Sequence, residues 1–372
     1  MSIDKKNYTS EFTFVGRAVI NDKTFKIGTV SESGWEYSSM NLGIDCGENG
    51  RQYASLMGGH STVRESVIYV HGKDENGRDD WKNRFTIDWD DREDDDVLDT
   101  IGDRCFFPAT LEKTNSGADF TKKFLSAYDA VPYIAEHLAD GDAVIVRGNL
   151  KFDDYNDSVS IKKEITSIRK IEADDNFNPK ATFKQSVLLT SDSVTKESID
   201  KEAGMITVSG YALEYKKELN GVEVKCNCPI AYDFKYKFDN EEMLLALMKQ
   251  FFKVKKGFVN MVNWEGEFVS EAPVVETTLD DIPKDIKVLI DLGLYTEEEV
   301  LKKAAGNGTR TNIALLKKPI IRMEGEEENK QMVLQLFEGH CTEDELFDVL
   351  PKTEEVWEPV TDDDTLSWLD EI

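Results

Sequence analysis

Apolar and polar residues alternate with a period of two along much of the first half of the chain, a pattern typical of half-buried β-strands. The stretches are residues 11–20, 35–46, 61–71, 83–89, 142–152 and 158–171. Asn76-Gly77 stands between the third and the fourth of them and favours a two-residue hairpin turn. We therefore expect a long protruding hairpin there.

Residues 121–139 follow a different period. Their apolar side chains recur at the spacing of an α-helix, and Asp140-Gly141 would end that helix. Pro132 lies inside the stretch and predicts a kink or two short helices. Gly148, in the strand that follows, indicates a bulge or a bend.

The second half repeats this layout. Strands are predicted at residues 205–213, 222–238 and 258–269, with an amphipathic helix at 240–252 capped by Asn240. Residues 209–213 align with residues 15–19 as a repeat. Five strands with a helix between the third and the fourth is the order of the OB fold, a small Greek-key barrel. The sequence thus predicts a mainly β protein with two tandem OB-fold barrels.

The predicted first barrel spans residues 1–172 and the second spans 181–323, with the polar segment 173–180 as their linker. Within the second, residues 282–306 favour two short inserted helices, the later one opening with a capping box at 296–299. Residues 310–323 would then return the final strand.

The barrel cores are expected to contain Phe12, Phe14, Phe25 and Phe258, because alternation buries every second residue of a strand. Residues 324–372 are expected to form an acidic tail. Within it, residues 339–350 favour a short amphipathic helix that would tether the remainder.

The charge of the chain is unevenly distributed. The 372 residues carry a net charge of −28, but residues 324–372 hold 17 acidic and 2 basic side chains, and residues 88–96 hold 7 acidic side chains and one Arg. The rest of the chain has a net charge of only −7. The barrels can therefore still carry basic grooves, and the segregated acidic tail reads as a separate functional element.

Several protein classes are disfavoured by composition. The sequence contains no apolar run of about 18 residues, which a membrane span would need. Residues 1–10 are polar and unlike a secretory signal. Five cysteines at irregular spacing argue against a disulfide framework. We expect a cytoplasmic protein, located in the host cytoplasm if it is encoded by a phage.

Residues 133–171 resemble the single-stranded DNA-binding protein family. In that family a short helix leads through a glycine step into a strand of the form V-x-V-x-G-x-L, then a hairpin and a final strand. The matching positions here are Gly141, Val144, Val146, Gly148 and Leu150. The resemblance implies a protein that binds and protects single-stranded DNA in replication, recombination or repair, without catalysis, cofactor or metal.

The C-terminus resembles the acidic tip of the same family. Asp362, Asp363 and Asp364 are followed by the apolar residues Leu366, Trp368, Leu369 and Ile372. The usual Pro-Phe ending is missing, and two barrels with a long insertion depart from the one-barrel bacterial form. This combination resembles a phage or plasmid version. The resemblance implies that Trp368, Leu369 and Ile372 bind replication or recombination proteins, and a homo-oligomer is compatible with it.

Single strands bind where cations neutralise phosphates and aromatic rings stack on bases. The candidate DNA-binding residues are therefore aromatic or basic, although alternation must place about half of the rings in the core. They are Trp35, Tyr37, Arg51, Tyr53, Arg64, Trp81, Lys82, Arg84, Arg147, Lys151, Phe152, Tyr155, Tyr215, Lys216, Lys217, Lys225, Tyr232, Lys235, Tyr236, Lys255, Lys256, Trp264 and Arg310.

Catalytic and metal chemistry have little support. The acidic run 88–96 could bind Mg²⁺ or Ca²⁺, but its spacing matches no ion-binding loop and favours a solvated loop. Cys226 and Cys228 could be half of a metal site, but a second pair is missing. The histidines are not spaced as ligands, and we expect no nucleophile with an adjacent base.

The tail leaves two interpretations open. Residues 354–372 contain eight acidic residues and no basic one, so we expect them to stay disordered until they meet a partner or the protein's own basic groove. A solubilising tail is the simpler alternative, although two tryptophans favour an interface. The competing function is an acidic OB-fold adaptor or DNA mimic that binds other proteins.

Overall fold

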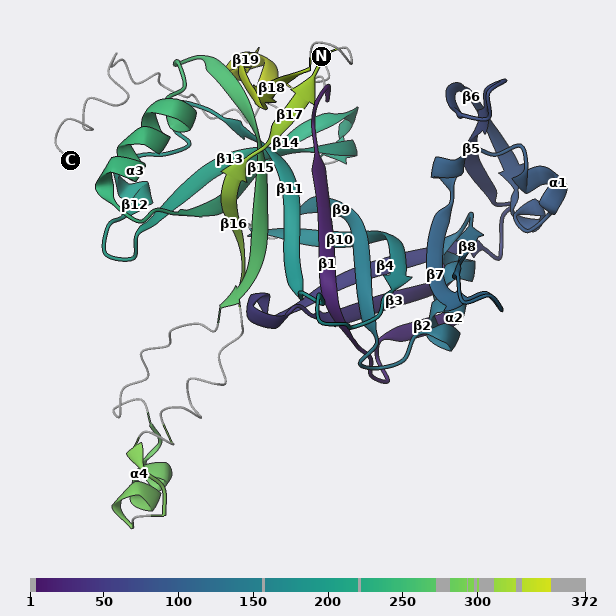
Figure 1. The fold of residues 1–372 in the computed structure, drawn as a ribbon, viewed down its shortest axis with the longest axis horizontal. Helices are drawn as coiled ribbons and strands as arrows, with labels where there is room; N and C mark the ends of the chain where they lie inside the picture. The colour runs from purple at the N-terminus through teal and green to yellow at the C-terminus, as the bar shows by residue number, and fades with distance from the viewer. Residues whose placement is uncertain are drawn as a thin grey trace.

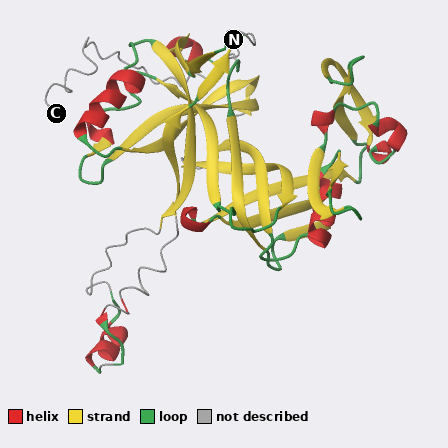
Figure 2. Ribbon diagram, in the orientation of Figure 1, coloured by secondary structure: helices red, strands yellow, loops and turns green. Residues whose placement is uncertain are grey.

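The computed structural model describes residues 5–155, 158–219, 222–271, 282–292, 294–297, 300, 311–325 and 330–348. Strands dominate these residues, and the helices are short and peripheral (Figure 2). Most strands belong to one continuous sheet of fifteen strands among the described residues, while β5–β6 and β17–β18 form separate two-stranded sheets. The prediction of a mainly β protein is confirmed.

The first half contains ten strands and two α-helices (Figure 1). The strands are β1 (Ser10–Val19), β2 (Phe25–Val30), β3 (Trp35–Asp45), β4 (Arg51–Ser61), β5 (Val67–Lys73), β6 (Asp79–Asp88), β7 (Phe107–Lys113), β8 (Asp119–Phe124), β9 (Ala143–Tyr155) and β10 (Ser158–Lys170). The helices are α1 (Asp95–Leu98) and α2 (Ala127–His137), with single 3-10 turns η1 (Gly47–Asn49), η2 (Trp89–Asp91) and η3 (Asp103–Cys105).

The second half, as far as it is described, contains nine strands. They are β11 (Lys180–Leu189), β12 (Ile199–Asp200), β13 (Met205–Leu219), β14 (Val222–Lys237), β15 (Phe258–Glu271), β16 (Thr311–Pro319), β17 (Ile321–Glu324), β18 (Gln331–Leu334) and β19 (Leu336–Thr342). Its helical elements are η4 (Lys196–Ser198), α3 (Glu241–Leu247), the π-turn η5 (Met248–Phe252), α4 (Lys284–Asp291) and α6 (Glu343–Phe347).

Each half contains a closed circuit of five paired strands. In the first, β1 pairs with β3, β3 with β4, β4 with β10, β10 with β9, and β9 again with β1. In the second, the same positions are taken by β11, β13, β14, β16 and β15. The pairs β4–β10 and β14–β16 are parallel, and the other pairs in both circuits are antiparallel. A helix, α2 or α3, follows the third strand of each circuit.

A phenylalanine packed over a glycine recurs in both circuits. Phe12 of β1 is paired with Gly148 of β9, and Phe183 of β11 with Gly266 of β15. A Cβ at Gly148 would lie 2.6 Å from the Phe12 ring, and one at Gly266 would lie 2.2 Å from the Phe183 ring. A β-bulge lies next to each glycine. Glycine is needed at position 148 because the Phe12 ring of the neighbouring strand occupies the space that a larger side chain would take.

This repeat corrects the alignment made from the sequence. The segment 209–213 lies in β13, whereas the partner of β1 in the repeat is β11, with Phe12 equivalent to Phe183. The polar segment before β11 has no regular structure up to residue 179, after which β11 pairs antiparallel with β1. Pairing between equivalent strands therefore joins the two halves into one sheet.

The two halves also share one hydrophobic core. The Phe268 ring lies 4.8 Å from that of Phe183 and 6.0 Å from that of Phe14, so side chains from both circuits meet. Lys163 of β10 is buried in the same place, with its ammonium 4.3 Å from the centre of the Phe268 ring. The boundary between the halves is therefore packed like an interior.

Local predictions near the hairpin are partly confirmed. The hairpin around Asn76-Gly77 exists as β5 and β6, which pair antiparallel and project beside α1 (Figure 1). The predicted strand 61–71 is confirmed only from Val67 onward, because β4 ends at Ser61 and β5 begins at Val67. The predicted helix 121–139 is shortened: residues up to Phe124 belong to β8, and Pro132 lies inside the single helix α2. Pairing of β8 with β7 overrides the local helical period.

The predicted core is largely confirmed. Phe12 and Phe14 are buried, and Phe25 is half-buried against the same cluster. Phe258 is 38% exposed, so its placement in the core is wrong. It lies at the first position of β15, where the ammonium of Lys255 covers its ring at 4.9 Å.

The segment expected to open the acidic tail is folded. β19 pairs with β15, and α6 follows with Thr342 as its N-cap. Of the predicted helix 339–350, residues 343–347 are helical and residues 339–342 are strand. Helix α4 lies within the predicted insertion, whereas most of the second inserted helix and residues 349–372 fall outside the described residues.

Candidate nucleic-acid interface

Aromatic side chains line the outer face of the β3–β4 pair. Strand alternation and the register Tyr37↔Gly59 and Gly43↔Tyr53 put Trp35, Tyr37, Met57, Tyr53 and Arg51 on one face. Trp35 is 42% exposed, Tyr53 48% and Met57 67%, whereas the intervening side chains of these strands largely point into the core. Four of the predicted DNA-binding residues thus come together on one surface.

Glycines on the neighbouring strand make room for two of these rings. A Cβ at Gly59 would lie 2.9 Å from Trp35 Nε1, and one at Gly43 would lie 3.3 Å from Tyr53 Cε1. Each ring therefore lies across a glycine of the adjacent strand. Both rings remain partly exposed in this arrangement, at 42% for Trp35 and 48% for Tyr53, so part of each is accessible for stacking.

The opposite face of the same strands is held rigidly. The Tyr128 hydroxyl of α2 donates a hydrogen bond of 2.6 Å to Glu36, which raises the pKa of Tyr128 above its ordinary value. His60 stacks on Trp89 with ring centres 4.6 Å apart. Arg92 holds Asp129 of α2 through two hydrogen bonds of 2.9 and 3.1 Å. The acidic run 88–96 is thus anchored through Trp89 and Arg92, while most of its carboxylates are exposed, as predicted.

Two cavities, of about 720 Å³ and 560 Å³, differ in the charge of the side chains that line them. The smaller one is formed by Arg51 and Tyr53 together with Asp45, Ser270 and Asn312, so it joins the β3–β4 face to β15 and β16. The larger one is lined by five carboxylates of the second half: Asp192, Glu343, Asp344, Glu345 and Asp348. A phosphate chain would be repelled there and tolerated beside Arg51.

The corresponding face of the second half is covered only around Tyr211. Phe347 of α6 packs on Tyr211 of β13 at 5.2 Å between ring centres, and Ser209 donates a 2.7 Å hydrogen bond to Asp233. This face therefore presents carboxylates and a packed helix. Tyr215, which is 54% exposed, lies further along β13 towards the hairpin end.

Two predicted cations connect the halves. Lys151 of β9 lies 3.8 Å from Glu214 of β13, and Lys216 of β13 lies 3.8 Å from Asp153 of β9. The buried Glu214 also accepts a 3.0 Å hydrogen bond from the backbone N–H of Phe152. These two lysines neutralise carboxylates at the joint, so they are less available to phosphates than the sequence suggested.

The remaining predicted cations are spread over the surface. Lys225 pairs with Glu223, the Lys235 ammonium donates to the Thr207 hydroxyl at 2.7 Å, and Lys255 lies over Phe258. Further exposed members of the predicted set are Arg64, Lys82, Arg84, Arg147, Lys217 and Lys256. The structure does not gather them into one groove.

The prediction of base stacking is wrong for three residues, because their rings are buried in the core. Phe152 is 2% exposed, Tyr236 5% and Trp264 0%. Trp264 is enclosed by Phe251, Phe252 and Tyr236, with ring centres between 5.4 and 6.1 Å away.

Tyr232 is half-buried against Phe152, and burial raises its pKa to about 12. The side chain of Tyr155 lies outside the described residues, and so do Arg310, Trp368, Leu369 and Ile372.

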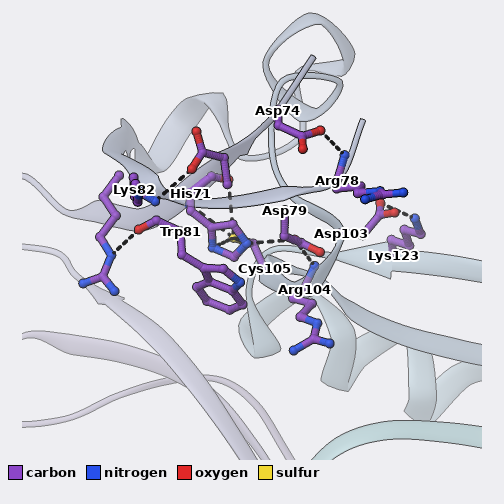
Figure 3. A network of polar contacts seen from close by, with 12 residues as sticks. His71, Asp74, Arg78, Asp79, Trp81, Lys82, Asp103, Arg104, Cys105 and Lys123 are labelled. Carbon is purple, nitrogen blue, oxygen red and sulfur yellow. Dashed lines mark hydrogen bonds and ion pairs between the residues drawn. The ribbon is translucent and has the colours of Figure 1, made fainter. Parts of the chain in front are cut away.

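The β5–β6 hairpin places Trp81, Lys82 and Arg84 on a second surface. Trp81 is 52% exposed and stacks on His71 with ring centres 4.1 Å apart (Figure 3). The guanidinium Nε of Arg84 donates a 3.0 Å hydrogen bond to the Trp81 carbonyl oxygen. Sequence reasoning missed Tyr69, which is 83% exposed in the middle of β5, although its alternation with the buried Val70 could have indicated it.

The expectation that no nucleophile has an adjacent base is wrong at one point. Cys105 Sγ lies 3.1 Å from Nδ1 of His71, and His71 Nε2 lies 2.8 Å from Asp79 (Figure 3). A thiol next to a histidine that is itself held by a carboxylate is the arrangement that activates a thiol nucleophile. Burial raises the pKa of the Cys105 thiol, however, which opposes formation of the reactive thiolate. Residues 34 apart in the chain meet here, so spacing could not reveal the contact.

Metal sites and membrane spans are not found among the residues that the structure describes. In that part of the chain, no group of three or more His, Cys, Asp or Glu side chains is placed to hold a metal ion. Over the same residues, no helix has the length and apolar character that crossing a bilayer requires.

The sequence matches the YorF family over residues 69–267, which is more than half of the chain. The chain therefore belongs to the YorF family. No curated protein matches the sequence.

Among solved structures, the chain is similar to the wild-type single-stranded DNA-binding protein of Thermus aquaticus, with 8% identity and a TM-score of 0.34 over 86% of this chain and 95% of that one. A deletion mutant of the Thermus aquaticus protein gives 11% identity and a TM-score of 0.32, over 75% of this chain and all of the other.

Proposed function

We propose that this protein binds single-stranded DNA, without catalysing a reaction, on the outer face of β3 and β4. The observation that carries the proposal is the group of rings on that face, the exposed Trp35 and Tyr53 and the half-buried Tyr37, with the cation Arg51 at its end. Rings at fixed positions can stack on any base, and a cation beside them neutralises a phosphate. The protein would thereby protect single strands during DNA replication, recombination or repair.

We further propose that each closed circuit is an OB barrel. Five strands, a helix after the third strand and a parallel closing pair between the third and the fifth support this assignment in both halves. In an OB barrel the second and third strands carry the ligand-binding face. Those strands are β3 and β4 in the first half, which is where Trp35, Tyr37 and Tyr53 lie.

A first prediction tests the face itself. Tyr37→Ala and Tyr53→Ala should each weaken binding to oligo-dT about tenfold, because each removes one ring on which a base can stack. Tyr53→Phe keeps the ring and should bind like the wild type. Fluorescence anisotropy of a labelled oligo-dT across a salt series provides the measurement. Arg51→Gln should also lower the slope of log affinity against log salt by about one.

Unchanged affinity of both alanine variants would rule out this face. Absence of binding by the wild type at low salt would rule out strand binding altogether. That result would leave the second candidate, an acidic adaptor or DNA mimic, which the five carboxylates around the Tyr211 cavity favour.

The acidic C-terminus is proposed to recruit replication or recombination proteins through Trp368, Leu369 and Ile372. A second prediction concerns its charge. A chain ending at Lys352 lacks eight carboxylates of residues 354–372 and should bind oligo-dT more tightly than the full chain at low salt, with the difference shrinking as salt screens it. Equal affinity of the two chains at low salt would show that the tail does not compete with DNA.

A further inference from the structure

We propose that the β5–β6 hairpin carries a second stacking site, formed by Tyr69, Trp81 and Arg84, which binds an unpaired nucleobase and its phosphate. The inference rests on the proposed function, because the occupant is a further part of the same single strand. The hairpin is a separate two-stranded sheet inserted between β4 and α2, and it stands apart from β3 and β4 (Figure 1).

The hairpin has one packed face and one open face. On the packed side, Val70 and Ile87 are buried against Ile101. On the other side, the register His71↔Arg84 and Tyr69↔Thr86 brings polar and aromatic side chains together. Strand alternation accounts for this division, so Tyr69 remains 83% exposed although it lies in mid-strand.

The open face is held in a fixed geometry. His71 is buried, and both ring nitrogens are hydrogen-bonded (Figure 3). Nε2 lies 2.8 Å from Asp79, and Nδ1 lies 3.1 Å from Cys105 Sγ. The backbone N–H of Arg104 donates to the same Asp79 oxygen at 3.0 Å. These hydrogen bonds lower the pKa of Asp79 and keep its carboxylate as an acceptor. Trp81 stacks on this His71 ring, so its own side chain is already ordered. Less conformational entropy of Trp81 is therefore lost when a base binds.

The cavity on this face has the chemistry that a nucleotide requires. It measures about 490 Å³ and is formed by Tyr69, His71, Trp81, Arg84 and Thr86, with Val70 and Phe85 behind them. Among the described residues its lining contains the Arg84 guanidinium and no carboxylate. Arg84 is itself oriented by its hydrogen bond to the Trp81 carbonyl. A ring with one free face beside a fixed guanidinium matches a base and its adjoining phosphate.

Affinity for two lengths of oligo-dT tests the proposal on the full chain. A strand of about 6 nucleotides covers little more than one barrel face, and one of about 30 nucleotides extends well beyond it. Tyr69→Ala and Trp81→Ala should each weaken binding of the longer strand about tenfold and change binding of the shorter one less than twofold. Trp81→Phe should retain most of the affinity. Met332→Ala, which truncates another large exposed side chain, should leave both affinities unchanged.

Far-UV circular dichroism of Tyr69→Ala and Trp81→Ala distinguishes a folding defect from a binding defect, and Tyr69→Ala removes a side chain that is mostly in solvent. Wild-type affinity of both variants for the longer strand, with Tyr53→Ala still weakened, would overturn the hairpin site and leave the β3–β4 face intact. Failure of the wild type to bind either strand would overturn both proposals.

Discussion

Gly148→Ala should destabilise the protein by about 3 kcal/mol or more, among the largest effects expected of one methyl group. The added Cβ would lie 2.0 Å from the backbone oxygen of Glu164 and 2.6 Å from the Phe12 ring. The ring could rotate, but the carbonyl cannot move away without breaking the pairing of β9 with β10. Chemical denaturation followed by circular dichroism should show a midpoint far below that of the wild type.

Gly266→Ala in the second circuit should behave in the same way, because its Cβ would lie 2.2 Å from the Phe183 ring and 2.6 Å from the Leu315 oxygen. Gly43→Ala is the matched control. Its nearest neighbours would be 3.2 to 3.4 Å away, so it requires a shift of only a few tenths of an ångström and should cost much less than Gly148→Ala. If Gly148→Ala unfolded at the same denaturant concentration as Gly43→Ala, the packing of Phe12 over Gly148 would not be needed for closure.

Lys163→Met should stabilise the protein at pH 7 by up to about 3 kcal/mol. The ammonium is buried between the halves over the Phe268 ring, and burial lowers the pKa of Lys163 from 10.5 to about 8. The neighbouring Cys46 thiol cannot supply a compensating anion, because burial raises its pKa to about 12. The folded state therefore bears the cost of a buried charge, and each pKa unit corresponds to about 1.4 kcal/mol.

The pH dependence has a definite sign. Below pH 8 the lysine is charged in both the folded and the unfolded chain. Between pH 8 and about 10.5 the folded chain releases its proton first, so the unfolded chain binds more protons and the stability of the wild type rises with pH. The advantage of Lys163→Met should therefore shrink between pH 7 and pH 10.

Free energies of unfolding at the two pH values provide the test. Lys162→Met is a matched control on the same strand, because Lys162 is exposed and pairs only with Asp153 at the surface among the described contacts. It should change stability by less than about 1 kcal/mol at both pH values. An advantage of Lys163→Met that is equal at pH 7 and pH 10 would contradict the prediction.

Much of the local structure was predictable from the sequence. The period of two in residues 11–20 and 142–171 corresponds to β1, β9 and β10, and Asn76-Gly77 lies at the turn of a hairpin. The side chain of Asn240 caps α3 through the N–H of Met243, as its position before an apolar run indicated. These features depend on neighbours within a few residues, so the sequence alone contains the required information.

The tertiary structure decided which aromatic rings face solvent. Trp35 and Trp264 both lie in strands beside charged residues, yet one is 42% exposed and the other is fully buried. The difference arises from which side of each strand points into its closed circuit, and that depends on partners far along the chain. The stacking surface on β3 and β4 could therefore be recognised only after the strands had been paired.

Contacts over long sequence separations decided the rest. The apolar period in residues 121–139 favoured a helix throughout, but pairing with β7 made residues 121–124 part of the strand β8. The pairing of β1 with β11 and the meeting of His71 with Cys105 leave no local signal, because each depends on the closure of a whole circuit or hairpin. The sequence predicted many of the strands, but not β2, β7, β8 or β11. Long-range packing determined which side chains form the exposed surfaces, because the side of each strand that is buried depends on how the whole sheet closes.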